Sequence, residues 1–239
     1  MLELRDLVKH YPSVGGETVR AVDGVSLEVQ GGEMVALYGP SGSGKTTLLL
    51  MVATLLAPTG GSVLIGGRDI SSLSEREASN FRLTELGFIR QNFDLLPGVS
   101  AIDNTVLKLL KAMRWRDAQR HVTPLLERLG MGERLHHRAE TLSMGERQRV
   151  MIARALSTEP SMLLADEPTG SLDTQRGREV LELLRGLCRE RGVAVVLVSH
   201  DPMAAEYADR VLALRDGQLS AYQHEQGPQA AASLVANKG

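Results

Sequence analysis

A glycine-rich turn between an apolar strand and a helix constrains this chain more than any other feature of its sequence. Met34-Val-Ala-Leu-Tyr38 is a short, nearly all-apolar run, typical of a strand that is buried on both faces. It leads into Gly39-Pro-Ser-Gly-Ser-Gly-Lys45-Thr46, and Lys45 to Leu56 then has the pattern of a helix. Glycines let backbone N–H groups point inward around an anion, and the helix adds the positive end of its dipole. We therefore expect a phosphate-binding turn.

The side chains of this turn indicate which anion it binds. Lys45 can neutralise the β- and γ-phosphates of a nucleoside triphosphate, and the Thr46 hydroxyl can ligate Mg²⁺. The alternative, a flexible Gly/Ser loop, is disfavoured by the strand before the turn and the helix after it. The residues that we expect to bind the nucleotide here are Gly39, Pro40, Ser41, Gly42, Ser43, Gly44, Lys45, Thr46 and Thr47.

A pair of carboxylates at the end of a later strand supplies the second part of such a site. Met162-Leu-Leu-Ala-Asp166-Glu167 is an apolar run that ends in two adjacent acids. We expect Asp166 to address Mg²⁺ through water, and Glu167 to orient and deprotonate an attacking water molecule. The alternative is a pair of exposed loop acids that cap the next element.

Composition and charge narrow the classes of protein to which the chain can belong. Its 239 residues suit one large domain or two small lobes. The 27 Lys and Arg against 29 Asp and Glu leave a net charge of −2, which excludes a broadly basic nucleic-acid binder but not a local anion pocket. The single Cys188 excludes an intrachain disulfide, and we expect it to be an ordinary helix residue.

No segment has the features of a membrane span. The longest apolar run, Leu48 to Ala57, is about half of the length that a spanning helix needs. Met1-Leu-Glu-Leu-Arg-Asp6 carries two acids and predicts a strand rather than a signal peptide. We therefore expect a cytosolic chain whose membrane role, if it has one, comes through a partner.

The periodicity of the apolar residues divides the chain into three parts. Alternation at Leu2, Leu4 and residues 25–29 predicts a small antiparallel sheet at the start. The middle part contains helical patterns only, at 101–112, 115–129 and 144–157. Strands then alternate with helices, which implies right-handed crossovers and a mainly parallel sheet. These last elements are strands at 161–165, 193–198 and 210–214 and helices at 174–191 and 202–207.

Leu142-Ser143-Met144-Gly145-Glu146 adds a second place where phosphate can bind. Ser143 and Gly145 at the start of a helix offer a hydroxyl group and unobstructed backbone N–H groups, although a simple helix N-cap is the alternative for this short motif alone. The motif resembles the signature sequence of ATP-binding-cassette (ABC) ATPases and, as in that family, stands just before the strand that ends at Asp166. The resemblance implies a head-to-tail homodimer, with ATP between the Lys45 turn of one copy and Ser143, Gly145 and Glu146 of the other.

Four further positions match the family in order and spacing. Gln91 resembles the Q-loop glutamine, which senses Mg²⁺ and water, and His200 resembles the switch histidine at the γ-phosphate. Asp173, in Ser171-Leu-Asp173, resembles the D-loop aspartate, and Tyr11 stands where the family stacks an aromatic ring on adenine. The resemblance therefore implies that Glu167, His200 and Gln91 are catalytic, that Tyr11 and Asp173 bind nucleotide, and that Thr46, Gln91 and Asp166 hold the metal.

The resemblance covers residues 1 to about 222 and implies an α/β fold. We expect a P-loop NTPase (RecA-like) parallel sheet core with an N-terminal antiparallel β subdomain and an α-helical subdomain inserted at about 92–150, and a loosely held tail at 223–239. Gly32-Glu-Met-Val-Ala36 and residues 91–97 are most similar to the lipoprotein-release (LolD) and macrolide-efflux (MacB) group. This implies transmembrane permease subunits as partners, a peripheral place at the cytoplasmic face of the inner membrane, and no nucleic-acid partner.

Three positions depart from the family pattern, and one of them, Glu146 in place of the commoner Gln, is familiar in this subgroup. Met144 replaces the first glycine of the usual Ser-Gly-Gly, so we expect backbone strain or weaker binding to the other copy if that position needs a positive φ. Arg90 stands where an apolar or aromatic residue is usual, and we expect it to alter the surface that faces the permease. His136 and His137 lack further ligands at metal-binding spacing, so we expect solvated loop residues.

Three functions remain open from the sequence. The first is an ATPase subunit that drives a permease. The second is a regulatory or mechanotransmission module of the cell-division type, which uses the same residues without transporting cargo. The third is a soluble P-loop kinase or repair ATPase, which the Ser143 motif disfavours because a kinase needs no second copy at its site. The basic stretch from Lys111 to Arg120 suits a solvated helix face better than a membrane contact.

Overall fold

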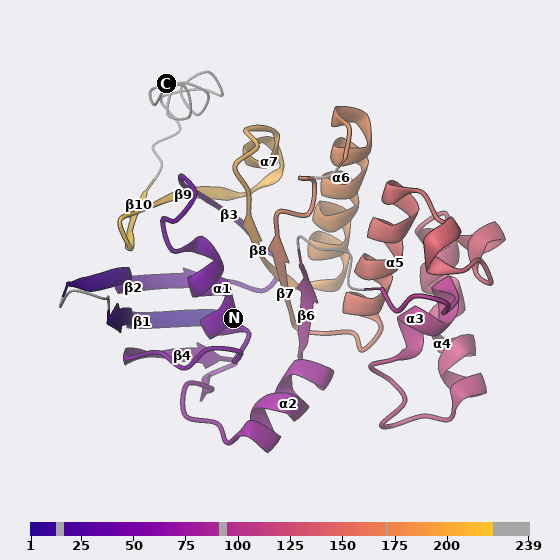
Figure 1. Cartoon of the computed structure of the whole chain (residues 1–239), viewed down its shortest axis with the longest axis horizontal. Coiled ribbons are helices and arrows are strands. Elements are labelled where there is room, and N and C mark those ends of the chain that lie inside the picture. The colour runs from indigo at the N-terminus through magenta and orange to yellow at the C-terminus, as the bar shows by residue number, and fades with distance from the viewer. Residues whose placement is uncertain (13–16, 91–94, 171, 222–239) are drawn as a thin grey trace.

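The computed structural model describes residues 1–12, 17–90, 95–170 and 172–221, which form two sheets, seven α-helices and two short 3-10 helices (Figure 1). The strands are β1 (Leu2–Pro12), β2 (Thr18–Val29), β3 (Met34–Tyr38), β4 (Gly60–Ile65), β5 (Arg68–Asp69), β6 (Leu86–Ile89), β7 (Met162–Asp166), β8 (Ala194–Val198), β9 (Arg210–Arg215) and β10 (Gln218–Ala221). The α-helices are α1 (Lys45–Val52), α2 (Glu75–Thr84), α3 (Ala101–Val106), α4 (Trp115–Arg128), α5 (Met144–Leu156), α6 (Thr174–Arg191) and α7 (Met203–Tyr207).

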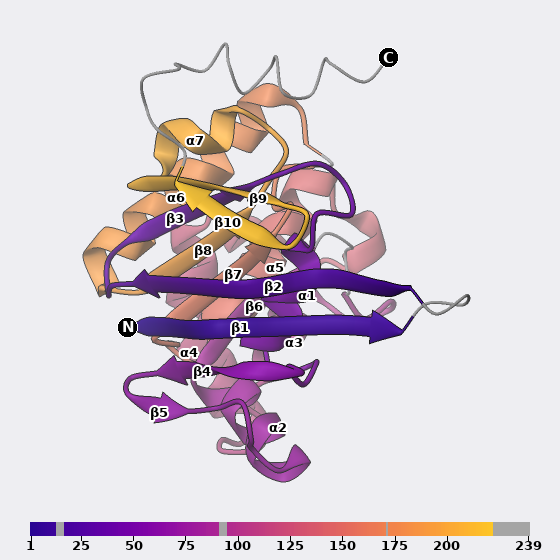
Figure 2. The ribbon, with the colours of Figure 1, turned by 90° about the vertical axis from the view of Figure 1, so that its left-hand side faces the viewer.

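The first sheet is antiparallel and has the strand order β2-β1-β4-β5, as Figure 2 shows from its open side. Alternating apolar residues of β1 and β2 point toward the interior, where they meet apolar residues of α1 and of the second sheet. Helix α1 is thereby packed between the two sheets. This packing fixes the turn that precedes α1.

The second sheet has the order β10-β9-β3-β8-β7-β6 and is parallel except for the β9–β10 hairpin. Strands β3, β7 and β8 are covered on both faces, and their near-continuous apolar sequences reflect this burial. Because β3, β8 and β7 are parallel neighbours, the segments that follow Tyr38, Val198 and Asp166 all leave the sheet at the carboxyl ends of its strands. The candidate site lies at these strand ends.

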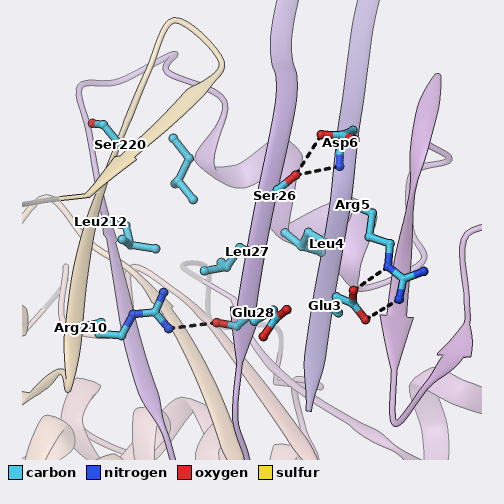
Figure 3. Close-up of a pocket in the computed structure, with 11 residues that line it drawn as sticks. Glu3, Leu4, Arg5, Asp6, Ser26, Leu27, Glu28, Arg210, Leu212 and Ser220 are labelled. Atoms are coloured by element: carbon cyan, nitrogen blue, oxygen red, sulfur yellow. Dashed lines mark hydrogen bonds and ion pairs between the residues drawn. The ribbon is translucent and has the colours of Figure 1, made fainter.

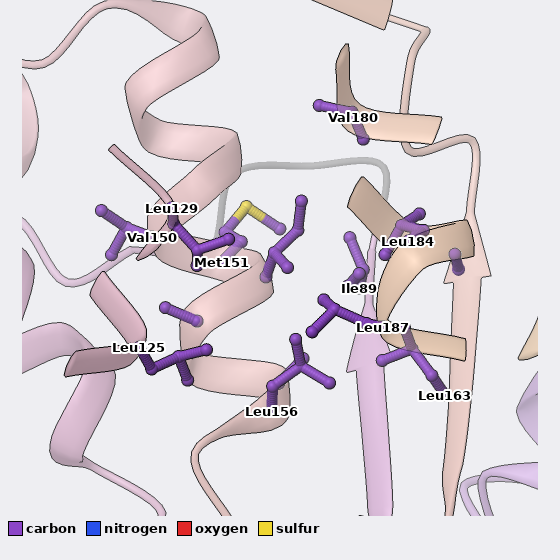
Figure 4. Packing of buried hydrophobic residues seen from close by; sticks show 14 of the residues in the cluster. Ile89, Leu125, Leu129, Val150, Met151, Leu156, Leu163, Val180, Leu184 and Leu187 are labelled. Carbon is purple, nitrogen blue, oxygen red and sulfur yellow. The ribbon is translucent and has the colours of Figure 1, made fainter. Parts of the chain in front are cut away.

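A helical layer packs against the far side of this sheet. Figure 4 shows Leu156 of α5 together with Leu184 and Leu187 of α6. These side chains pack against Ile89 at the end of β6 and Leu163 near the start of the neighbouring strand β7. Helices α3 and α4 continue the same core on the other side of α5. Helix α5 therefore connects the core sheet with the outer helices, and its N-terminus carries the Ser143 motif.

The expected α/β architecture is confirmed, with local differences. Helix α1 ends at Val52 rather than near Leu56, because Thr54 adopts a φ of +54° that a right-handed helix does not allow. Helix α3 ends at Val106, six residues before the expected end at residue 112. Helix α2, strand β5 and strand β10 were not expected from the sequence.

No helix in the described part of the chain combines the length and the apolar character needed to cross a membrane. The expected tail at 223–239 lies outside the described residues. The boundaries of an inserted helical subdomain at about 92–150 remain a prediction.

Candidate active site

The glycine-rich turn joins β3 to α1 in a space that only glycine fits. Gly44 has a φ of +101°, and a Cβ atom there would lie 1.9 Å from the carbonyl oxygen of Ala21 in β2. At Gly39 a Cβ atom would lie 2.2 Å from the carbonyl oxygen of Leu214 in β9. Both sheets therefore press against the turn and hold its backbone in place, as an anion-binding loop requires.

Lys45 lies beneath this turn, with 8% of the residue exposed. Its ammonium group donates to the carbonyl oxygens of Gly39 (2.8 Å) and Pro40 (2.9 Å). Burial lowers the pKa of Lys45, while the carboxylates of Glu167 and Asp166 act in the opposite direction. The turn thus holds the Lys45 ammonium in place, and a bound phosphate can replace the two carbonyl oxygens as the acceptor of its hydrogen bonds.

Asp166 at the end of β7 faces the start of α1. The Thr46 hydroxyl donates to Oδ2 of Asp166 over 3.3 Å, and 9% of the Asp166 residue is exposed. Burial raises the pKa of Asp166, whereas the Thr46 hydrogen bond lowers it. A hydroxyl and a carboxylate side by side are the oxygen donors that Mg²⁺ prefers.

The described residues contain no group of three or more His, Cys, Asp or Glu side chains that could hold a metal ion. A cation at Thr46 and Asp166 would therefore take its other ligands from phosphate oxygens and water, which is typical of Mg²⁺ at nucleotide sites. His136 and His137 are exposed, as expected for solvated loop residues.

Glu167 follows Asp166 with a φ of +50°, and its backbone N–H donates to Val198 of β8 over 2.9 Å. Its side chain reaches the segment after β8, where Nδ1 of His200 lies 2.8 Å from Oε1 of Glu167. The other oxygen, Oε2, is buried and has no partner among the described residues. A buried carboxylate oxygen without a donor suits an ordered water molecule or a reacting proton.

Ser143 caps α5, which is the alternative that the sequence left open for this motif. Its hydroxyl accepts from the N–H of Glu146 (3.3 Å), and the Glu146 carboxylate accepts from the N–H of Ser143 (2.7 Å). The hydrogen bond from Ser143 and the nearby Arg134 hold the pKa of Glu146 below its usual range. The expected strain at Met144 is absent, because this residue begins α5 with ordinary helical backbone and is 44% exposed.

The Ser143 turn opens on a cavity of about 630 Å³ beside α6. Asp173 caps α6, where its carboxylate accepts from the N–H of Arg176. Ser143, Gly145 and Asp173 all line this cavity. The structure adds Arg176, which was not expected from the sequence and whose side chain lies against Gly145. The Asp173-x-x-Arg176 spacing, which places both residues in one helical turn, was the available signal.

Tyr11 lies near the end of β1, and 37% of it is exposed. The ammonium of Lys9 sits 5.4 Å from the centre of the Tyr11 ring and donates to the carbonyl oxygen of Ala57 (2.7 Å). Lys9 was also missed at the sequence level, although two residues apart in a strand share one face. Gln91, an expected catalytic and metal-binding residue, lies outside the described residues.

A groove of about 620 Å³ between β1–β2 and β9–β10 is a weaker candidate (Figure 3). Its charged and polar groups bond to one another: Arg5 pairs with Glu3, Ser26 bonds to Asp6, and Arg210 donates to the carbonyl of Glu28. These groups are already satisfied, so the groove offers little to a ligand.

The comparison with known proteins distinguishes between the functions that the sequence left open. The family model described as ABC transporter matches residues 22–170. The chain belongs to this ABC transporter family. It is an ABC-type ATPase cassette, so the kinase alternative is set aside.

Two curated relatives and one solved structure place the chain within the family. It is 46% identical to LolD 2, a lipoprotein-releasing system ATP-binding protein of Caulobacter vibrioides, over 92% of this chain and 96% of that one. It is also 46% identical to MacB, a macrolide export ATP-binding/permease protein of Rhodopirellula baltica, but spans only 32% of that protein and 91% of itself.

The solved structure is the dimeric, post-hydrolysis state of the ATP-binding cassette MJ0796 bound to ADP and Pi. It superimposes with a TM-score of 0.82 at 36% identity, covering 92% of this chain and 98% of that one. The likeness supports ATP as the nucleotide of this ABC cassette.

Proposed function

We propose that this chain is the ATP-binding subunit of a membrane complex of the lipoprotein-release or macrolide-efflux type, and that it works as a head-to-tail homodimer. The observation that carries the proposal is that Glu167, which contacts His200, directly follows Asp166, which pairs with Thr46 at the start of α1. This arrangement suits the removal of a proton from water beside a bound γ-phosphate.

In the proposed mechanism each residue at the carboxyl ends of β3, β7 and β8 has one role. The N–H groups of the glycine turn and the Lys45 ammonium bind the phosphates and stabilise the charge that develops on them. Thr46 and Asp166 hold Mg²⁺, which supplies charge neutralisation at the β- and γ-phosphates when bound. Glu167 takes a proton from the attacking water, and His200 keeps the Glu167 carboxylate oriented.

The second copy completes the site in this proposal. Ser143 and the backbone of Gly145 form a helix N-terminus with an exposed serine hydroxyl at the mouth of an open cavity, a suitable partner for the γ-phosphate of the other copy. Asp173 and Glu146 stand beside it, and Tyr11 stacks on the adenine. Gln91 is proposed, from the family resemblance alone, to contact Mg²⁺ and water.

The permease and the cellular location are inferred from the relatives. LolD 2, which this chain matches over nearly its whole length, is named as the ATP-binding protein of a lipoprotein-releasing system, whereas MacB carries a permease in its own chain. We therefore propose that this chain works with a permease, as the names of both relatives indicate. The ATPase subunit then lies at the cytoplasmic face of the membrane through that permease.

Affinity purification of the full chain from membranes, followed by ATPase assays of the complex, tests this proposal. The expected result is a co-purifying membrane protein whose cargo raises the rate of ATP hydrolysis. A complex that hydrolyses ATP at a rate independent of every cargo, but in step with an extracytoplasmic hydrolase, would support the regulatory module instead. ATP hydrolysis with no membrane partner at all would contradict the permease part of the proposal.

A further inference from the structure

Tyr38 is the last residue of β3 and carries the only hydroxyl group of that strand. Its ring is half-buried and packs against the core that α5 and α6 share with the second sheet. The hydroxyl group donates to the carbonyl oxygen of Asp201 and accepts from the N–H group of Ala205 (3.1 Å). Apolar packing alone does not need a hydroxyl group, so these two hydrogen bonds indicate a further role for Tyr38.

Two consecutive residues of β3 hold the chain on either side of His200. The N–H group of Ser199 donates to the carbonyl oxygen of Leu37 (3.2 Å), and Tyr38 bonds to the carbonyl oxygen of Asp201. Between these anchors, the side chain of His200 is 64% exposed. Within the described ranges of the chain, its imidazole bonds only to the carboxylate of the proposed general base. The orientation of the imidazole therefore depends on how firmly the backbone of His200 is held.

The segment that Tyr38 holds is short and depends on contacts from outside itself. Asp201 begins the turn into α7, where its carboxylate accepts from the N–H group of Met203 (2.9 Å). Helix α7 has five residues, fewer than a helix needs to be stable by itself. The Tyr38 hydroxyl group provides a contact from the core sheet to both the turn and the helix.

The two backbone groups that bond to Tyr38 each have a second partner. The carbonyl oxygen of Asp201 also accepts from the N–H group of Ala204 (3.1 Å). The N–H group of Ala205 also donates to the carbonyl oxygen of Pro202 (3.0 Å). Loss of the Tyr38 hydroxyl group therefore leaves neither group unsatisfied. We expect a variant without this hydroxyl group to fold, with a turn that is held less firmly.

Tyr38 also adjoins the phosphate-binding turn in the chain. The next residue is Gly39, whose carbonyl oxygen accepts from the Lys45 ammonium group (2.8 Å). Tyr38 therefore links the turn that is proposed to bind the phosphates to the turn that carries His200.

We infer that Tyr38 is a positioning residue for ATP hydrolysis. Its hydroxyl group holds the turn after β8, so that His200 keeps the Glu167 carboxylate in the orientation that proton removal requires. The inference rests on the proposed roles of Glu167 and His200. Because Tyr38 acts through His200, loss of its hydroxyl group slows hydrolysis and leaves ATP binding unchanged.

Tyr38→Phe tests the inference in the full-length protein, because phenylalanine keeps the ring and lacks only the hydroxyl group. We expect kcat for ATP hydrolysis to fall about fivefold, while KM and the equilibrium affinity for ATP change less than about twofold. Steady-state ATPase assays and equilibrium nucleotide binding measure these quantities. A hydroxyl group with a purely structural role would lower the unfolding temperature and leave kcat unchanged.

Tyr207→Phe is the matched control, since it removes a hydroxyl group from α7 by the same substitution. The Tyr207 hydroxyl group donates to the carboxylate of Glu182 in α6 (3.4 Å). We expect kcat of this variant to stay within about twofold of the wild-type value. An equal fall of kcat in Tyr38→Phe and Tyr207→Phe would show that the loss comes from a weakened α7, and would overturn the inference.

The double variant Tyr38→Phe/His200→Ala shows whether Tyr38 acts through His200. We expect it to hydrolyse ATP as fast as His200→Ala alone, because the hydroxyl group then has no imidazole to position. If Tyr38→Phe lowers kcat by the same factor with and without the His200 imidazole, the inference is overturned.

The outcomes separate this inference from the proposed function. Hydrolysis at the parental rate in Tyr38→Phe, beside slow hydrolysis in His200→Ala, would overturn the inference alone. Hydrolysis at the parental rate in His200→Ala would contradict the proposed role of His200 and the inference with it. If Tyr38→Phe does not fold, Tyr38→Leu takes its place, because the rest of β3 is apolar. Loss of folding in both variants would show that the hydroxyl group is structural and would also overturn the inference.

Discussion

Nδ1 of His200 lies 2.8 Å from Oε1 of Glu167, and the second oxygen of this carboxylate is buried without a partner among the described residues. The two residues follow neighbouring parallel strands, so the sheet itself brings them together. The contact holds one oxygen of the carboxylate and leaves the other available. This arrangement is suited to a general base whose orientation is set by the histidine.

Glu167→Gln tests the role of this carboxylate in catalysis. Glutamine has the same size but cannot take up the proton, so we expect the rate of ATP hydrolysis to fall at least ~100-fold while ATP affinity changes little. Phosphate release and equilibrium nucleotide binding measure the two quantities. Hydrolysis at the parental rate would show that another group is the base.

The control for this prediction is the double variant Glu167→Gln/His200→Ala. If His200 acts by orienting Glu167, the double variant hydrolyses ATP no more slowly than Glu167→Gln alone. Additive losses would instead indicate a separate role for His200 at the phosphate.

Asp166→Asn is expected to separate stability from metal binding. Burial raises the folded-state pKa of Asp166 above its unfolded value, so the protonated carboxyl stabilises the fold at low pH, and this contribution is lost as the pH rises through the folded-state pKa. Asparagine stays neutral, so without nucleotide the variant should unfold about 2–4 °C higher at neutral pH. The two melting temperatures should converge at low pH.

With added Mg²⁺ and ATP, the wild type should melt at a higher temperature than Asp166→Asn, because asparagine is a poorer metal ligand than a carboxylate. Thermal melts with and without Mg-ATP check both parts of the prediction. A variant that is less stable than the wild type without ligand at neutral pH would contradict the assigned cost of burial.

Gly44→Ala should damage the turn more than Gly42→Ala. Both glycines have positive φ, +101° and +81°, so alanine at either position carries a strain of about 1–2 kcal/mol. At Gly44 the new Cβ atom would also lie 1.9 Å from a backbone oxygen of Ala21, whereas at Gly42 nothing lies within 4 Å. Chemical denaturation should therefore show a larger loss of unfolding free energy for Gly44→Ala. Equal losses would mean that the strand β2 does not constrain the turn.

Lys9→Met is expected to weaken nucleotide binding through Tyr11. The ammonium lies over the ring and is anchored to Ala57, so it holds the ring in one orientation. Without it we expect ATP affinity to fall about two- to fivefold, with little change in kcat. The selectivity for ATP over the triphosphate of ribose alone should fall by the same factor. An unchanged selectivity would indicate that Tyr11 does not contact the base.

Regular elements with strong apolar periodicity could be predicted from the sequence, and helix α6 was predicted with the boundaries Thr174–Arg191 that the structure has. The missed elements had local signals that are not periodic. Ser74 and Glu77 form a capping box at the start of α2, and Asp216-Gly217, both with positive φ, form the tight turn between β9 and β10. The early end of α1 depends on Thr54, whose left-handed backbone has no signature in the sequence.

Candidate site residues could be proposed from the sequence where they lie within short motifs, as for Lys45, Asp166 and Ser143. The contacts that position these residues come from distant segments and could not be predicted. Ala21 closes the space at Gly44, and Val198 fixes the backbone of Glu167. Such contacts depend on the order of the strands, which a single motif does not contain.

A mixing experiment tests the central claim, that each nucleotide lies between Lys45 of one copy and Ser143 of the other. Two variants are prepared in the Glu167→Gln background, one with Lys45→Ala and one with Ser143→Arg. Each variant alone carries a defect in both composite sites of a dimer, whereas a mixed dimer has one intact site and one doubly defective site.

Analytical ultracentrifugation of the two variants, separately and mixed, with saturating Mg-ATP is the measurement. The account predicts monomers for each variant alone and an ATP-dependent heterodimer, with one nucleotide bound, for the mixture. A mixture that stays monomeric while the Glu167→Gln parent dimerises, or a single variant that dimerises as well as that parent, would contradict it.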